Sequence, residues 1–126
     1  MAYHADATDH TDKEILTWEG FGQAQRDLSQ AVVNSGFMPE VIIGLARGGL
    51  SLAGAMTYSL GVKLTDAINV EFYTDVNETL PDPVLLAPML DTESIAGRKI
   101  LVTDDVADSG RTLALVIKLL RGFGAG

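Results

Sequence analysis

The sequence has no cysteine among its 126 residues, and this absence excludes disulfide bonds and metal sites built from thiolates. It also has no apolar run close to the roughly 20 residues that cross a bilayer. The first residues are polar and acidic, and they lack the apolar segment of a secretory signal. We therefore expect a cytoplasmic protein that makes no contact with a membrane.

Basic residues are also scarce. The sequence has 9 lysines and arginines against 17 acidic residues, so its formal net charge is −8. Binding to nucleic acid requires clustered basic side chains that neutralise phosphates, and no basic run is present. The charge balance therefore argues against a nucleic-acid partner.

The length is that of one domain, and hydrophobic residues make up 47% of it, which is enough for a core. We predict a polar lead-in at residues 1–16 and a single domain at residues 17–126. His4 and His10 lie among acidic residues of the lead-in, and we assign them no role.

The domain begins with a predicted helix. Thr17 is a suitable N-cap residue, and Gly36 is a suitable stop. The apolar residues between them recur at helical spacing and predict a face that packs on the core: Trp18, Phe21, Leu28, Ala31 and Val32. We interpret Trp18 and Phe21 as core residues and not as a platform for a ligand.

Strands and helices then alternate along the chain. Apolar, β-branched runs predict strands at Val41–Leu45, at 62–73 with its strongest part at Ile68–Tyr73, and at Ile100–Thr103. Helices are predicted at Ser51–Leu60 and at Leu113–Leu120, and a short strand is predicted at Val84–Leu86. This alternation indicates an α/β fold with a mainly parallel sheet flanked by helices.

Ligands of such folds bind beyond the carboxyl ends of the parallel strands. The predicted strand Ile100–Thr103 is followed directly by Asp104 and Asp105. Where a strand gives way to a loop, both carboxylates can accept hydrogen bonds from a vicinal diol, and one can bind a hard cation such as Mg²⁺.

Residues 108–112, with the sequence DSGRT, open the next predicted helix. Backbone N–H groups at a helix start, together with the Ser109 and Thr112 hydroxyls, form a site for phosphate. Gly110 permits close approach of the backbone. A carboxylate pair for a diol followed by an anion site fits a ribose 5-phosphate.

Other interpretations of the same pattern exist. A strand that ends in two aspartates also occurs in receiver domains and in Walker B elements, but neither requires DSGRT directly afterwards. No G-x-x-x-x-G-K-[ST] motif precedes it. Structural capping by Asp108 or Ser109 would explain one residue and not the whole set. A receiver-like or structural α/β domain is kept as an alternative.

The segment Ile100–Leu113 resembles the signature of type I phosphoribosyltransferases: an apolar strand, two acids, a spacer, an acid and a Ser/Thr-Gly-x-Thr turn. The resemblance implies that Asp104 and Asp105 bind the ribose of phosphoribosyl pyrophosphate and its Mg²⁺. It assigns the 5-phosphate to a loop of Asp108, Ser109, Gly110, Arg111 and Thr112. In purine-using members the acid at the Asp108 position lies near the reacting base nitrogen, which makes Asp108 the candidate general acid/base.

The segment Gly44–Gly49, GLARGG, is similar to the pyrophosphate loop of the same family, whose often cis backbone turns N–H groups toward the diphosphate. Arg47 supplies a permanent cation whose planar fork suits phosphate oxygens. Gly48 and Gly49 leave room for a ligand against the backbone. On its own, this segment would be interpreted as a tight strand-to-helix turn with a solvated arginine.

From Thr17 to Gly124 the sequence most resembles the bacterial xanthine/guanine/hypoxanthine branch of the family. The resemblance implies transfer of the 5-phosphoribosyl group from phosphoribosyl pyrophosphate to a nitrogen of a purine-type base by a Mg²⁺-dependent homodimer. Residues 73–90 take the place of a loop that closes over substrate. The alternative is an inactive or regulatory module on the same fold, such as the RNA-binding attenuators of pyrimidine operons, which the acidic charge disfavours.

The sequence stops at RGFGAG, directly after the predicted helix that follows the phosphate loop. Family members continue with another core strand beside Ile100–Thr103. We therefore expect the last strand or strands of the type I phosphoribosyltransferase-like core to be missing and Ile100–Thr103 to lie at a sheet edge. The segment that reads the base in the purine branch is also absent, so the acceptor base is left open.

Overall fold

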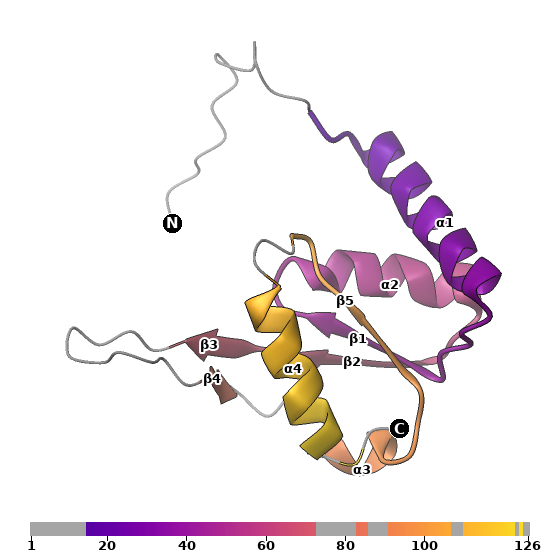
Figure 1. Cartoon of the computed structure of the whole chain (residues 1–126). Coiled ribbons are helices and arrows are strands. Elements are labelled where there is room, and N and C mark those ends of the chain that lie inside the picture. The colour runs from indigo at the N-terminus through magenta and orange to yellow at the C-terminus, as the bar shows by residue number, and fades with distance from the viewer. Residues whose placement is uncertain (1–14, 73–82, 86–90, 107–109, 123, 125–126) are drawn as a thin grey trace.

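The computed structural model describes residues 15–72, 83–85, 91–106, 110–122 and 124. Helices and strands alternate along most of this chain (Figure 1). In chain order the elements are α1 (Trp18–Ser35), β1 (Val41–Leu45), α2 (Gly49–Leu60), β2 (Leu64–Ile68), β3 (Val70–Phe72), β4 (Pro83–Leu85), α3 (Thr92–Ile95), β5 (Ile100–Thr103) and α4 (Arg111–Gly122).

The centre of the fold is a three-stranded parallel sheet in the order β2-β1-β5. Val41 of β1 pairs with Leu64 of β2 on one side and with Ile100 of β5 on the other. All five residues of β1 are buried, as expected of a central parallel strand covered on both faces. The predicted α/β class with a parallel sheet between helices is confirmed.

Alternate residues of β1 build two core layers. Ile43, with Val41 and Leu45, packs on the face covered by α4, whose Val116 and Leu120 are buried there. Ile42 points to the other face, where it packs with buried residues of α2. Figure 1 shows α2 and α4 on opposite sides of the sheet. The alternation of side chains along an extended strand therefore places one helix on each face.

The second strand differs from its prediction. The run Ile68–Tyr73 is the most β-branched and aromatic part of that region, but the strand that joins the main sheet is Leu64–Ile68. Residues Val70–Phe72 form a separate antiparallel pair with Pro83–Leu85. Because β2 lies at the sheet edge, its first residues are exposed, and its sequence carries a weaker apolar signal than a central strand.

Helix α1 begins and ends as predicted. The Thr17 hydroxyl accepts a hydrogen bond from the Gly20 N–H at 3.0 Å. Gly36 ends the helix in the left-handed conformation, with φ of 81°. Figure 1 shows α1 lying across α2 instead of against the sheet.

The predicted buried face of α1 is correct only in part: Val32 packs against the core layer that α2 covers, but other members of the face do not. Trp18 is 84% exposed and Leu28 is 48% exposed, whereas the buried residues of the helix are Gln25 and Ser29. The physical reason is the neighbour: α1 packs on a second helix, where the Ser59 hydroxyl donates to the Gln25 side-chain oxygen at 2.7 Å. Trp18 contacts Phe21 edge to face at 6.0 Å and is not a core residue.

Strand β5 has a sheet partner on one side only among the described residues, as expected for an edge strand. None of the described helices combines the length and the apolar character that a membrane crossing requires.

Candidate functional site

Two turns meet at the carboxyl edge of the sheet. Strands β1 and β5 are parallel neighbours, with Gly44 paired to Thr103, so the residues that follow each strand emerge side by side. An open cavity of about 540 Å³ lies between them. Its lining residues are Leu45, Ala46, Arg47, Gly48, Val70, Asp104, Asp105 and Thr112. Five of the residues predicted as site residues therefore line one cavity, although they come from segments far apart in the sequence.

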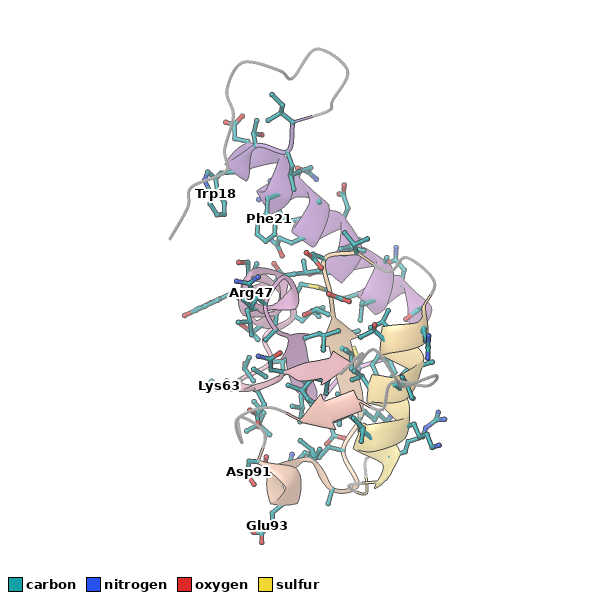
Figure 2. All side chains as sticks on the ribbon, turned by 90° about the vertical axis from the view of Figure 1, so that its left-hand side faces the viewer. Trp18, Phe21, Arg47, Lys63, Asp91 and Glu93 are labelled. Atoms are coloured by element: carbon teal, nitrogen blue, oxygen red, sulfur yellow. The ribbon has the colours of Figure 1, made fainter. Side chains whose placement is uncertain are left out.

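The turn after β1 carries the cation of the cavity. The Ala46–Arg47 peptide bond is cis, as the resemblance led us to expect. The turn is held by the Ala46 N–H, which donates to the Ile68 carbonyl at 2.8 Å, and by the Leu50 N–H, which donates to the Arg47 carbonyl at 3.1 Å. Arg47 itself is exposed, and Figure 2 shows it beside the start of α2. Its guanidinium can therefore contact an anion that enters from solvent.

The turn after β5 carries two carboxylates. One oxygen of Asp104 accepts from the Asp105 N–H, and one oxygen of Asp105 accepts from the Val106 N–H, each at 2.8 Å. These bonds orient both groups and leave acceptor capacity, because a carboxylate offers about four lone-pair positions. Partial burial and the neighbouring Asp105 carboxylate raise the pKa of Asp104, while the Asp105 N–H opposes that shift. Donors or a cation placed here would stabilise charge that the cavity otherwise disfavours.

Contacts within the protein favour glycine at positions 48 and 49. A Cβ atom on Gly48 would overlap the Asp105 carboxylate. A Cβ atom on Gly49 would overlap the carbonyl oxygen of Thr103. The two turns therefore touch through backbone at Gly49 and through the Asp105 side chain at Gly48, and Gly49 is buried beneath the cavity instead of lining it.

Part of the predicted phosphate loop reaches the same cavity. Gly110 has φ of 75°, a conformation that favours glycine, and its carbonyl accepts from the Ala114 N–H at 2.9 Å in the first turn of α4. Thr112 lines the cavity, whereas the exposed Arg111 does not. Asp108 and Ser109 lie outside the described residues.

The carboxylate pair fits magnesium in one particular mode. No group of three or more potential ligand side chains occurs in the described part of the chain, so a site built by protein side chains alone is not found there. Mg²⁺ commonly binds through one or two carboxylates together with substrate phosphates and water. Asp104 and Asp105 line an open cavity together with Arg47, and this arrangement matches that mode.

Val70 is a lining residue that the sequence did not single out. It begins β3, directly after the edge strand β2 has ended at Ile68. Val70 lies beyond the carboxyl end of β2, just as the two polar turns lie beyond the carboxyl ends of β1 and β5. Ligands of parallel sheets bind at these positions. This position was missed because the predicted boundaries merged β2 and β3.

The chain is similar in sequence and in fold to known phosphoribosyltransferases. A family model for the phosphoribosyl transferase domain matches residues 11–126. The chain is 33% identical over 107 residues to a xanthine-guanine phosphoribosyltransferase of Cereibacter sphaeroides. The matched region covers 85% of this chain and 58% of that protein. The chain is also 30% identical over 105 residues to a protein of the same name from Idiomarina loihiensis, with 82% of this chain and 63% of that protein covered.

The fold has a solved counterpart at comparable identity. The crystal structure of a purine phosphoribosyltransferase from Pyrococcus horikoshii has a TM-score of 0.75 and 33% identity, covering 91% of this chain and 72% of that one. The two xanthine-guanine phosphoribosyltransferases are longer than this chain, which spans about three fifths of the length of each.

Proposed function

The chain belongs to the phosphoribosyltransferase family, and from this premise we propose that it transfers the 5-phosphoribosyl group of phosphoribosyl pyrophosphate to a nitrogen of a purine-type base. The observation that carries the proposal is the shared cavity. It is lined by Arg47, by the pair Asp104 and Asp105, and by Thr112, which supports binding of one small anionic ligand there. Relatives named as xanthine-guanine and purine phosphoribosyltransferases support the purine class of acceptor.

Each end of the donor would meet a different part of the cavity. The carboxylates of Asp104 and Asp105 would accept hydrogen bonds from the two ribose hydroxyls. Arg47 would bind the diphosphate, and the turn at Gly48 would allow close approach of its oxygens. The N-terminus of α4, with the Thr112 hydroxyl, would bind the 5-phosphate. Ser109 is proposed to join this loop.

The reaction is a displacement at ribose C1. The bond from C1 to the diphosphate oxygen breaks, the base nitrogen forms the new bond to C1, and pyrophosphate leaves with the bonding electrons. Positive charge develops on the sugar in the transition state, next to the two carboxylates, while negative charge grows on the diphosphate beside Arg47. Mg²⁺ held by Asp104 and Asp105 together with the ligand would neutralise part of the diphosphate charge.

The proton of the base nitrogen needs an acceptor when a purine attacks. We assign this role to Asp108, which follows the ribose acids Asp104 and Asp105 in the motif and opens the phosphate loop. A homodimeric state and a cytoplasmic location are part of the same proposal, in line with the family.

Replacing Arg47 with alanine is expected to weaken binding of phosphoribosyl pyrophosphate roughly tenfold to a hundredfold, because a charge-assisted contact to the diphosphate is lost. Arg121→Ala, at an exposed position in the last turn of α4, is the matched control and should leave the dissociation constant unchanged. Isothermal titration with Mg²⁺ present measures both. If both variants bound phosphoribosyl pyrophosphate with equal affinity, Arg47 would not be part of its binding site.

The catalytic part of the proposal is tested by incubating the protein with phosphoribosyl pyrophosphate, Mg²⁺ and one base at a time. The panel comprises guanine, xanthine, hypoxanthine, adenine, uracil and orotate, with release of pyrophosphate as the readout. We expect turnover with at least one purine and none with the pyrimidines. Binding of the donor without turnover of any base would instead support the alternative of a regulatory module.

A further inference from the structure

The last residue of β5 makes a buried hydrogen bond to the start of α2. The hydroxyl of Thr103, a residue that is 4% exposed, donates to the carbonyl oxygen of Gly49 at 2.8 Å across 54 positions of sequence. The three residues before Thr103 in this strand are Ile100, Leu101 and Val102, all apolar. A buried hydroxyl is tolerated where it has a partner, and here Gly49 supplies that partner.

This bond lies at the junction of the two halves of the cavity. Thr103 directly precedes Asp104 and Asp105, which carry the negative charge of the site. Gly49 directly follows Gly48 and lies two positions after Arg47, which carries the positive charge. A displacement of β5 against α2 would therefore change the distance between the carboxylates and the guanidinium.

The two segments approach each other closely around this bond. The Thr103 carbonyl oxygen and the Asp105 carboxylate occupy the space that Cβ atoms on Gly49 and Gly48 would need. The same Gly49 carbonyl also lies close to Gly44 of β1. A Cβ atom on Gly44 would lie 2.9 Å from the Gly49 carbonyl oxygen. Van der Waals contact sets how closely the segments approach. It does not fix sliding along the contact, which a directional hydrogen bond does.

We propose that Thr103 is a positioning residue that fixes the spacing between the ribose-binding carboxylates and the diphosphate-binding turn. This inference rests on the proposed function, since it concerns how both ends of one donor molecule are bound together. Thr103 contacts neither end and acts through Gly49 and Asp104.

A spacing role has a distinctive thermodynamic signature. A ligand that occupies only one half of the cavity does not depend on the spacing of the halves. A ligand that joins both halves depends on it strongly, because the second contact forms at high effective concentration only when the geometry fits. Loss of the bond should therefore weaken binding of the joined ligand and spare binding of its fragments.

The experiment compares Thr103→Val with the unchanged chain by isothermal titration in Mg²⁺, using phosphoribosyl pyrophosphate, pyrophosphate alone and ribose 5-phosphate alone. We expect the affinity for phosphoribosyl pyrophosphate to fall roughly three- to tenfold, the size of one hydrogen bond. The affinity for each fragment should stay within about twofold. Thr103→Ser keeps the hydroxyl and should restore the affinity for the joined ligand.

Thr57→Val is the matched control, because the Thr57 hydroxyl also donates to a glycine carbonyl, that of Gly54 at 2.6 Å, away from the cavity. It should leave binding of all three ligands unchanged. If Thr103→Val does not fold, Thr103→Cys takes its place with the same expectation, since a thiol is a much weaker hydrogen-bond donor than a hydroxyl.

Two results would overturn the positioning role of Thr103 and leave the proposed function intact. One is equal affinity of Thr103→Val and the unchanged chain for phosphoribosyl pyrophosphate. The other is an equal loss for the joined ligand and for both fragments, which would indicate a general effect on the fold. Failure of the unchanged chain to bind phosphoribosyl pyrophosphate would overturn the proposed function and this inference together.

Discussion

Replacing Asp104 and Asp105 together by asparagine is expected to weaken binding of phosphoribosyl pyrophosphate roughly a hundredfold or more, because two charge-assisted acceptors for the ribose hydroxyls are lost at once. The asparagine oxygens can still accept the backbone hydrogen bonds from Asp105 and Val106 positions, so the turn should keep its shape. Titration with the ligand and Mg²⁺ measures the change.

The loss of binding should not be accompanied by a loss of stability. Burial and the Asp105 carboxylate raise the pKa of Asp104, which means that the folded state disfavours its charged form. At pH 7, which lies above the ordinary aspartate pKa, this shift therefore lowers the free energy of unfolding, and Asp104→Asn removes that effect. We expect a small rise in melting temperature for this single variant at pH 7.

The pH dependence of that rise follows from the direction of the shift. A carboxyl group with a raised pKa binds its proton more tightly in the folded state, so its contribution to stability falls as pH increases through the folded pKa. The advantage of Asp104→Asn should therefore vanish at pH values below the ordinary aspartate pKa. Asp27→Asn, at an exposed position in α1, controls for the loss of one negative charge. A lower melting temperature of Asp104→Asn than of the unchanged chain at neutral pH would contradict a raised pKa of Asp104 in the folded state.

Gly48→Ala and Gly49→Ala are expected to fail in different ways, although the residues are neighbours. At Gly49 the added methyl group meets the carbonyl oxygen of Thr103, which belongs to the backbone and cannot move alone. At Gly48 the three nearest atoms all belong to the carboxylate end of the Asp105 side chain, which can rotate, and the φ of −61° at Gly48 suits alanine. Gly49→Ala should thus destabilise the fold, and Gly48→Ala should displace Asp105.

The expected magnitudes separate the two variants clearly. Overpacking against backbone typically costs about 1–3 kcal/mol, so Gly49→Ala should lower the melting temperature by several degrees. Gly48→Ala should change the melting temperature little and should weaken binding of phosphoribosyl pyrophosphate roughly tenfold. Thermal unfolding and titration on the same samples give both quantities.

Gly54→Ala is the control in the same helix. A Cβ atom there meets nothing within 4 Å, so alanine should leave binding unchanged and should raise stability slightly through its better helix propensity. If Gly49→Ala were as stable as Gly54→Ala, the close contact between α2 and β5 would be wrong.

The parts of the fold that the sequence predicted correctly are those with strong local signals. The β-branched run Val41–Leu45 is the buried central strand, and its neighbour Ile100–Thr103 delivers the two aspartates to the carboxyl edge of the sheet. The N-cap at Thr17 and the stop at Gly36 are also local features, and both are confirmed. A residue type that suits one backbone conformation can be identified without knowledge of its neighbours.

The parts that the sequence did not predict depend on contacts between distant segments. Helical spacing indicated that α1 has an apolar face, but it could not show that α1 packs on α2 through Gln25 and leaves Trp18 exposed. The division of residues 64–72 into a sheet strand and a hairpin strand depends on pairing with β1.

The same limit applies inside the candidate site. The charged residues that line the cavity carry a recognisable pattern, and Arg47, Asp104 and Asp105 were all predicted. The hydrogen bond from Thr103 to Gly49 has no local pattern, because it joins two segments through one threonine in an otherwise apolar strand. The prediction that Asp108 is the general acid/base stays a prediction, since it lies outside the described residues.

The most direct test of the account is an equilibrium titration of this chain with phosphoribosyl pyrophosphate in the presence of Mg²⁺, repeated with the variant carrying Asp104→Asn and Asp105→Asn. We expect saturable binding of one ligand per unchanged chain, and we expect the double variant to fold but to lose this binding. No binding to the unchanged chain, or binding that the two asparagine substitutions leave unaltered, would contradict it.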